Sequence, residues 1–301
     1  MNRPLAYVCL YSSMSLVGCY VALSKPLVAA IPVLLLVTLR FGIAAIVMLP
    51  WLKQDPGKLP LTKASKQLIF LQSFFGNFGF SIFLLFGIAH TSATAAGIIL
   101  SLIPVSVALM SWVWLKEKPS GQVVVALLLA VATVLFINLA RVDSSSGHAH
   151  GASLLGNMLL LGAVVCEAIY IVIGKKLTAN LSAKRLSALI NLVGLCLMLP
   201  LGLWVVFGQG ALFNFAAVEL KIWLLLLFYA LAASQWSVLL WMTGLQYVPA
   251  SQASVFTVAI PIASTLIGVF FLNEPFLFSH AIAFFCAALG VVLIATAAQK
   301  P

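Results

Sequence analysis

The chain has 301 residues, of which 63% are hydrophobic and only 7% are charged. Soluble domains carry about 25% charged residues, so a soluble fold is excluded and most side chains must face lipid or one another. The net charge of +10 does not indicate a nucleic-acid partner, because the basic residues stand singly between apolar runs. The five cysteines also fall inside apolar runs without metal-ligand spacing, and they are interpreted as small core residues.

Charged, proline and glycine clusters divide the chain into ten apolar runs of about the length that a bilayer requires. The first run, 5–23, is longer than the 7–15 apolar residues typical of the h-region of a signal peptide, and a matching segment recurs in mid-chain. The sequence therefore predicts an all-α polytopic membrane protein with ten transmembrane helices. The expected spans are 5–23, 31–49, 67–88, 93–115, 121–139, 152–173, 186–207, 222–245, 250–272 and 279–297.

The polar stretch 141–151 divides the chain almost at its midpoint, and the two halves match each other in register. With an offset of 150, Tyr20–Lys25 matches Tyr170–Lys175 and Met48–Pro50 matches Met198–Pro200. With an offset of 157, Gly87–Ala93 matches Gly244–Ala250, Ile103–Pro104 matches Ile260–Pro261, and Leu115–Glu117 matches Leu272–Glu274. These matches predict a duplicated five-helix unit, with a first repeat at 1–140, a periplasmic linker at 141–151 and a second repeat at 152–301.

Because five is an odd number, the second repeat must enter the membrane from the opposite side, so the repeats are inverted. With the N-terminus in the cytoplasm, twelve Lys and Arg residues fall on the inside and three on the outside, as the positive-inside rule requires. We therefore expect both termini in the cytoplasm and the chain in a bacterial inner membrane. Inverted repeats are a recurring plan of secondary transporters.

The pattern resembles the EamA-type ten-helix branch of the drug/metabolite transporter superfamily over nearly the whole chain. The resemblance is carried by Leu39–Phe41, the join at Gly87–Ala96, the mid-helix prolines Pro104 and Pro261, and the helix ends at Glu117 and Glu274. It implies a carrier of small organic molecules. Members of the family export amino acids, nucleosides, polyamines and drugs, so the resemblance names no single ligand.

Two charged residues are expected inside the spans, Arg40 and Glu167, at similar depth near mid-bilayer. At about 1.5 Å per residue, Glu167 lies roughly 12 Å from the end of its helix at Lys175. A charge at this depth needs a partner or water. Two readings stay open: a structural ion pair between the two, or a ligand or proton site between the repeats.

Further candidates for the binding site come from aromatic and polar residues at matched positions. Tyr170 shares a helix face with Glu167, and Tyr20 is its equivalent in the first repeat. Asn77 corresponds to Ser234, which is followed by Gln235 and Trp236. Lone amides in membrane helices often only bond to neighbouring helices, so cavity lining and simple packing are both open for these residues.

Pro104 and Pro261 each remove a backbone donor in the middle of an expected span, so a kink is expected at both. The paired kinks are either static shape or hinges for alternating access. His148 and His150 lie in the linker without a third ligand, so no metal site is expected.

No nucleophile–base set, metal motif or phosphate loop is present in the sequence, which argues against an enzyme and against an ATP-driven pump. A channel is left open, although the sequence shows no ring of like charges of the kind that lines channel pores. No cofactor is expected. The favoured function is secondary transport of an amino acid or related amine, in the export direction, with proton coupling through Glu167 and a homodimer left open. The alternatives are an exporter of drugs or nucleoside-like compounds, and a receptor or structural protein that transports nothing.

Overall fold

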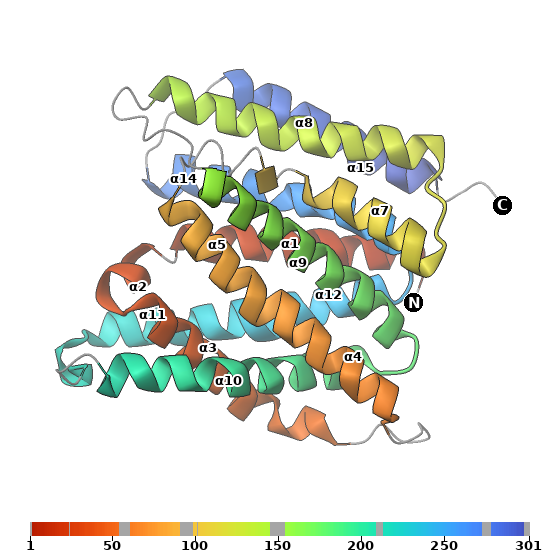
Figure 1. Cartoon of the computed structure of the whole chain (residues 1–301). Helices are drawn as coiled ribbons and strands as arrows, with labels where there is room; N and C mark the ends of the chain where they lie inside the picture. The colour runs from red at the N-terminus through yellow and green to blue at the C-terminus, as the bar shows by residue number, and fades with distance from the viewer. Residues whose placement is uncertain are drawn as a thin grey trace.

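The computed structural model describes residues 2–23, 25–53, 61–90, 99–100, 102–144, 154–208, 213–272 and 278–297. Within these ranges the chain is built from helices (Figure 1). The α-helices are α1 (Arg3–Leu23), α2 (Lys25–Ala30), α3 (Val33–Met48), α4 (Lys63–Ser73), α5 (Phe80–Ala89), α7 (Ile103–Leu115), α8 (Gly121–Ser144), α9 (Leu154–Thr178), α10 (Ala183–Phe207), α11 (Leu220–Ala230), α12 (Ser237–Leu245), α13 (Ala250–Ala253), α14 (Ala259–Leu272) and α15 (Phe278–Ala297). Short helical turns of other types are η1 (Leu49–Leu52), η2 (Phe74–Gly79), η3 (Phe215–Ala217), η4 (Leu231–Trp236) and η5 (Ser254–Val258).

The predicted all-α polytopic fold is confirmed. The described residues of every predicted span are mostly helical: Ile31 and Pro32 precede α3, Leu102 is a turn, and the described part of the fourth span, 93–115, is mainly α7. Five helical segments of the described chain are by themselves long and apolar enough to cross a membrane: Val33–Leu52, Lys63–Leu84, Leu154–Thr178, Ala183–Phe207 and Leu220–Leu245. Helix α8 continues to Ser144, so the first residues of the predicted linker 141–151 are helical. The remainder of the linker, with His148 and His150, lies outside the described residues.

The third helix of each half is interrupted by a π turn at the same place. The turn η2 joins α4 to α5, and η4 joins α11 to α12, and their bounds differ by the repeat offset of 157. The Phe80 amide donates to the Phe75 carbonyl, and the equivalent Ser237 amide donates to the equivalent Ala232 carbonyl. π turns are rare and are often found at functional sites. Two of them at matched positions indicate that a functional site lies at this level of the bundle.

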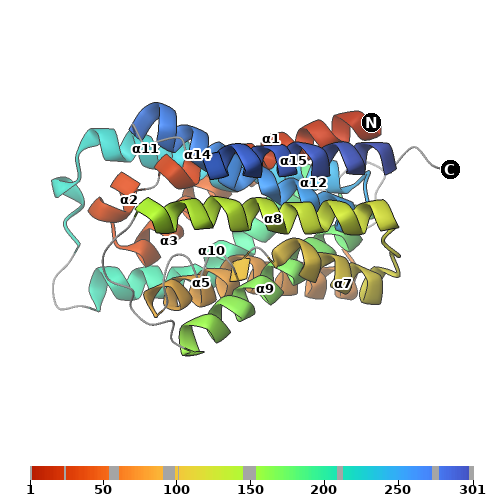
Figure 2. The ribbon, with the colours of Figure 1, turned by 90° about the horizontal axis from the view of Figure 1, so that it is seen from above.

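The two halves interlock through matched helix contacts. Helix α1 of the first half packs against α12 and α14 of the second, and α9, the equivalent of α1, packs against α5 and α7 of the first. Helix α3 packs against its equivalent α10, and α8 lies along its equivalent α15 at one side of the bundle (Figures 1 and 2). The first helix of each half is therefore held between the third and fourth helices of the other.

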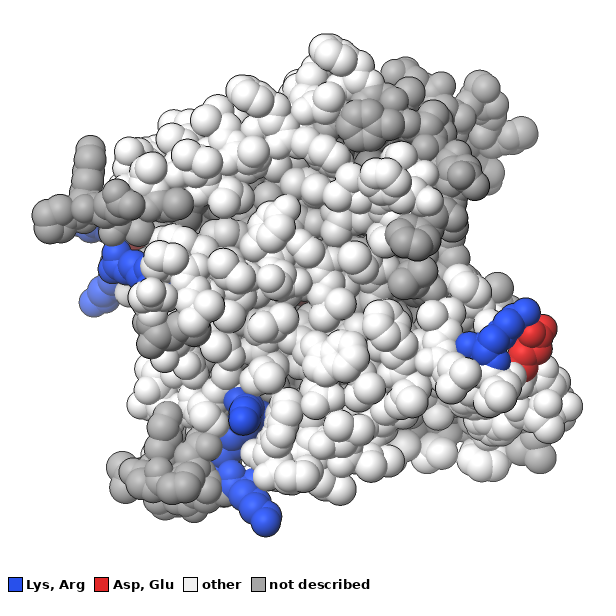
Figure 3. All heavy atoms as spheres, turned by 180° about the vertical axis from the view of Figure 1, so that it is seen from behind, with Lys and Arg blue, Asp and Glu red and all other residues white. Residues whose placement is uncertain are grey.

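The surface is that of a protein surrounded by lipid. Leu154, Ile46 and Phe285 are among many large apolar side chains that are more than two-thirds exposed, at 73%, 69% and 69%. The described face in Figure 3 is almost free of charge, and its Lys, Arg, Asp and Glu residues gather towards two opposite edges. The beginning of α1, the α7–α8 connection and the end of α15 lie at one of these ends, which we call the terminus end (Figure 1).

Gly244 tests the contact between α1 and α12. A Cβ atom at Gly244 would lie 2.6 Å from Leu10 Cγ and 2.8 Å from the Ala6 carbonyl oxygen. The Gly244→Ala variant is expected to lose about 1–3 kcal/mol of stability, because a well-packed contact must move apart, and to melt at lower temperature in detergent. Gly121→Ala is the matched control, since nothing lies within 4 Å of a Cβ at Gly121; equal melting temperatures for the two variants would contradict the packing.

Candidate functional site

A cavity of about 470 Å³ lies between the two halves, at the level of the two π turns. We call it the central cavity. Its size falls within the range of about 300–1,000 Å³ that is common for small-molecule sites. It is lined by Ser13, Met14, Val17, Tyr20, Val33, Val37, Arg40, Phe41, Gly76, Asn77, Phe80, Ser81, Leu84, Ile103, Glu167, Tyr170, Asn191, Tyr229, Ala233, Ser234, Ser237, Val238, Trp241, Thr257 and Ile260.

Most of the lining residues come as repeat-equivalent pairs, one from each half. The pairs are Val17 and Glu167, Tyr20 and Tyr170, Phe41 and Asn191, Gly76 and Ala233, Asn77 and Ser234, Phe80 and Ser237, Ser81 and Val238, Leu84 and Trp241, and Ile103 and Ile260. The same positions of both halves therefore build the two walls. The charges do not follow this symmetry, because the residue equivalent to the acidic Glu167 is the apolar Val17.

Arg40 and Glu167 both line the central cavity, as the sequence predicts for a ligand site. Both belong to the described chain, and no ion pair joins them. The Arg40 guanidinium carbon lies 4.4 Å from the centre of the Phe41 ring, a cation–π contact, and the Arg40 Nε is buried without a hydrogen-bond partner. The structural ion pair considered from the sequence is thus not formed, and the two opposite charges face one space.

The amides of the cavity wall also hold helices together. The Asn77 Nδ2 donates to the Ile190 carbonyl over 3.0 Å. Asn191 Nδ2 donates to the Ser187 carbonyl over 2.8 Å and to the Ser234 carbonyl over 2.9 Å. Asn77 therefore lines the cavity and bonds to a neighbouring helix at once. Asn191 was not among the predicted residues, although a lone amide within the span 186–207 was a visible signal.

Aromatic rings surround the cavity. Tyr20 meets the Tyr229 ring edge-on, with 5.3 Å between the ring centres and an angle of 90°. Tyr170 contacts the π turn η2, where Gly76 leaves room for its ring. Tyr20 and Tyr170 were predicted, whereas Tyr229 was not. Tyr229 stands five residues before Ser234, a spacing that an α-helix does not place on one face but that the π turn brings to the same wall.

Gln235 and Trp236 are not among the residues that line the central cavity. The lining residues of this segment are Ala233, Ser234, Ser237, Val238 and Trp241, and the last four follow the helical spacing i, i+3, i+4 and i+7. Gln235 and Trp236 stand about 100° and 200° around the helix from Ser234. Trp236 is 42% exposed and meets the Phe228 ring instead. The helical spacing i+3 and i+7 from Ser234 points to Ser237 and Trp241 as the cavity-lining residues.

Pro104 and Pro261 stand near helix beginnings, not in the middle of uninterrupted helices. Pro104 is in the first turn of α7, directly after the turn at Leu102. Pro261 is the third residue of α14, which follows the 3₁₀ turn η5. Pro is well tolerated in the first turn of a helix. At Pro261 the expected kink takes the form of a change from a 3₁₀ turn to an α-helix. A 3₁₀ stretch within a longer helix often marks a hinge, and the hinge role stays a prediction.

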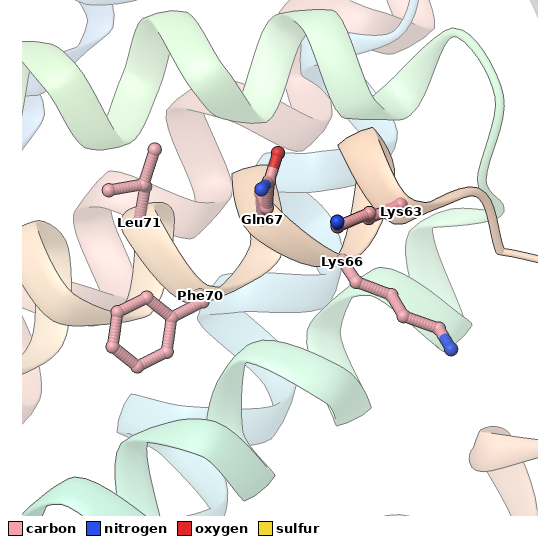
Figure 4. Close-up of a pocket in the computed structure, with 5 residues that line it drawn as sticks. All are labelled: Lys63, Lys66, Gln67, Phe70 and Leu71. Carbon is pink, nitrogen blue, oxygen red and sulfur yellow. The ribbon is translucent and has the colours of Figure 1, made fainter.

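A second hollow lies on the outside of α4. It has a volume of about 480 Å³ and is lined by Lys63, Lys66, Gln67, Phe70 and Leu71 (Figure 4). All five residues come from one helix, and Phe70 and Leu71 are 48% and 38% exposed. This is an open groove along a single helix, whereas the central cavity gathers residues from both halves. The central cavity is therefore the candidate site.

The interlocked halves and the mid-bundle cavity define a polytopic carrier, and the comparisons with known proteins agree. The model of the EamA-like transporter family matches residues 4–139 and 154–296, and the chain belongs to this family. An uncharacterized transporter of Bacillus subtilis (strain 168), YetK, is 34% identical over 297 residues, which cover 98% of this chain and 88% of YetK. An uncharacterized transporter of Archaeoglobus fulgidus is 26% identical over 207 residues, which cover 69% of each chain.

One solved crystal structure, described only as that of a protein, has a TM-score of 0.79 to this chain at 18% sequence identity. It covers 99% of this chain and 100% of its own length, so the two share a fold. The family and the relatives make this chain a multi-pass membrane transporter and not an enzyme.

The contact between Gly76 and Tyr170 offers a test of the cavity wall. A Cβ atom at Gly76 would lie 2.6 Å from Tyr170 Cγ, so Gly76→Ala is expected to cost about 1–3 kcal/mol of stability. In the background Tyr170→Ala the ring is absent, and the same Gly76→Ala change should cost much less, giving a coupling free energy between the two sites. The four proteins are compared by thermal melting.

Gly42→Ala serves as the control on the neighbouring helix α3, because a Cβ there meets only Leu195 Cδ1 at 4.0 Å. Additive effects of the Gly76 and Tyr170 changes would contradict the contact.

Proposed function

We propose that the central cavity binds a small zwitterionic metabolite, an amino acid or a related amine, and that the protein carries it across the membrane by alternating access. One observation carries the proposal: Arg40 and Glu167 line the same cavity without neutralising each other. A buried charge inside the membrane is costly unless it has a partner. A ligand that presents a carboxylate to Arg40 and an ammonium group to Glu167 supplies both partners.

The remaining walls suit the apolar part of such a ligand. Tyr20, Tyr170 and Trp241 offer aromatic faces, and Val17, Val37 and Ile260 offer aliphatic ones. Apolar lining with a few placed polar groups is the usual composition of a small-molecule site. The same aromatic walls favour a second candidate, a flat drug or nucleoside-like compound, which would use the rings but not both charges.

The ligand class is tested by a thermal-shift screen of the purified protein against amino acids, polyamines, nucleosides and sugars. A ligand present at about 100 times its Kd adds about 2.7 kcal/mol to the stability of the folded protein. Amino acids or amines are expected to raise the melting temperature, and they should then show flux in proteoliposomes. A shift with nucleosides alone would favour the second candidate and overturn the zwitterion.

Glu167 is proposed to contact the ammonium group of the ligand and to carry a coupling proton, and export is the proposed direction. The Glu167→Gln variant is expected to fold like the wild type, since no ion pair is lost, and to lose flux by at least about tenfold through loss of a charge-assisted hydrogen bond. Flux against external pH, measured in proteoliposomes, should change with it.

Glu219→Gln is the matched control, because Glu219 is 66% exposed and pairs with Lys221 outside the cavity. Wild-type flux and wild-type pH dependence in Glu167→Gln would refute the role of Glu167. The double variant Arg40→Gln/Glu167→Gln should not regain stability relative to the single variants, as a structural ion pair would require.

We infer that the terminus end faces the cytoplasm of a bacterial cell, with the chain in its inner membrane. The support is the excess of Lys and Arg in the segments expected on that side. A reporter that is active only in the periplasm should be silent when fused after residue 301 and active when inserted at residue 147, in the linker. The opposite pattern would reverse the assignment.

A further inference from the structure

The connection between α12 and α13 is held from two sides by groups of opposite charge. Lys175, near the end of α9, donates from Nζ to the Leu245 carbonyl over 2.8 Å and to the Gln246 carbonyl over 3.2 Å. These carbonyls end α12. Carbonyls at a helix C-terminus carry partial negative charge, so a lysine ammonium group is the appropriate partner.

Glu117 holds the other side of the connection. Its Oε2 accepts from the Ala250 amide over 2.9 Å and from the Ser251 amide over 3.5 Å, at the N-terminus of α13. Burial raises the pKa of the Glu117 carboxyl above its ordinary value, while the Ser251 amide, the Lys175 charge and the Ala250 amide lower it. The carboxyl is thus taken partly out of water to make this contact.

The backbone before Glu117 is bent to reach it. Lys116 has φ 57° and ψ 25°, the left-handed conformation, and among the described residues no other non-glycine residue has a positive φ. This conformation ends α7 and turns the chain back, with the Glu117 amide bonded to the Ser111 carbonyl. A residue held in a sparsely populated conformation persists only when surrounding contacts determine it.

The four elements that meet here are also walls of the central cavity. Helix α9 carries Glu167 and Tyr170, α12 carries Trp241, and α7 and α14, which continues α13 through η5, carry Ile103 and Ile260. Lys175 is five residues beyond Tyr170, about 7.5 Å along the helix axis. The contact therefore lies just beyond the cavity, towards the terminus end. Lys175 ties α9 to the end of α12 within the second half, and Glu117 ties the first half to α13 of the second.

We propose that Glu117 and Lys175 are positioning residues of the transport cycle that together form a latch, which closes the terminus end of the central cavity. The latch rests on the proposed alternating-access function. The two side chains must release the α12–α13 connection whenever the cavity opens at this end. Their hydrogen-bond partners are backbone groups of the protein, so the latch can form without a ligand.

The test measures access to the cavity and needs no substrate. In a background without the five native cysteines, Val17→Cys places a thiol on the cavity wall. Its labelling by a membrane-impermeant maleimide is measured from each side, in oriented membrane vesicles. Lys175→Met and Glu117→Ala should each raise labelling from the terminus end by about tenfold, because a hydrogen bond to a charged group shifts a two-state equilibrium by at least that factor.

Matched controls separate latching from general charge effects. Lys176→Met removes the neighbouring exposed lysine of the same helix end, and Glu219→Ala removes an exposed acid elsewhere; both should label like the parent. If Glu117→Ala does not fold, Glu117→Gln, which keeps one acceptor oxygen and removes the charge, takes its place.

Labelling of the latch variants equal to that of the controls, or raised equally from both sides, would overturn the latch. The proposed ligand fails separately, by absence of thermal shift and flux in the wild-type protein. A protein that labels as expected but transports no amino acid or amine keeps the latch and loses the zwitterion.

Discussion

Inside a bilayer no water is available to the backbone, so each peptide group must find its partner within the protein. The packing of the mid-bundle region depends on this constraint. The Ser234 carbonyl in one π turn accepts from Asn191, and the Ser237 carbonyl just after it accepts from the Ser13 hydroxyl over 2.7 Å. Polar cavity residues therefore fasten α12 to α10 and α1. Much of the hydrogen-bonding capacity of the cavity wall is used by the fold, which leaves the two charges as the strongest groups for a ligand.

The scaffold of the cavity is symmetric, but its chemistry is not. Equivalent positions supply both walls, yet Glu167 stands opposite Val17 and Asn191 opposite Phe41. Arg40 is also unmatched, since its equivalent is Ile190, whose carbonyl accepts from Asn77. In the proposed alternating-access function, a duplicated scaffold would allow two related conformations, and the asymmetric residues within it would bind the ligand. Binding and conformational exchange can therefore be altered at different positions of the same walls.

The helices could be predicted from the sequence, because the length of the apolar runs and the register of the repeat report them directly. Tyr20, Arg40, Asn77, Glu167 and Tyr170 all line the central cavity. Gln235 and Trp236 do not, and Trp236 is 42% exposed and meets the Phe228 ring. Tyr229 stands five residues before Ser234, which is not an α-helical spacing, and the π turn brings the two residues to the same wall. The contacts of Glu117 and Lys175 could not be predicted either, because hydrogen bonds from side chains to the backbone leave no periodic pattern in the sequence.

The strained backbone at Lys116 limits the strength of the proposed latch. Lysine in the left-handed conformation costs about 1–2 kcal/mol. States separated by a few kcal/mol exchange and respond to ligands, whereas a latch that is too strong would hold one conformation whatever ligand bound. In the proposed transport cycle, the cost at Lys116 keeps the Glu117 contact short of that limit, so that a ligand in the central cavity can decide whether the terminus end opens.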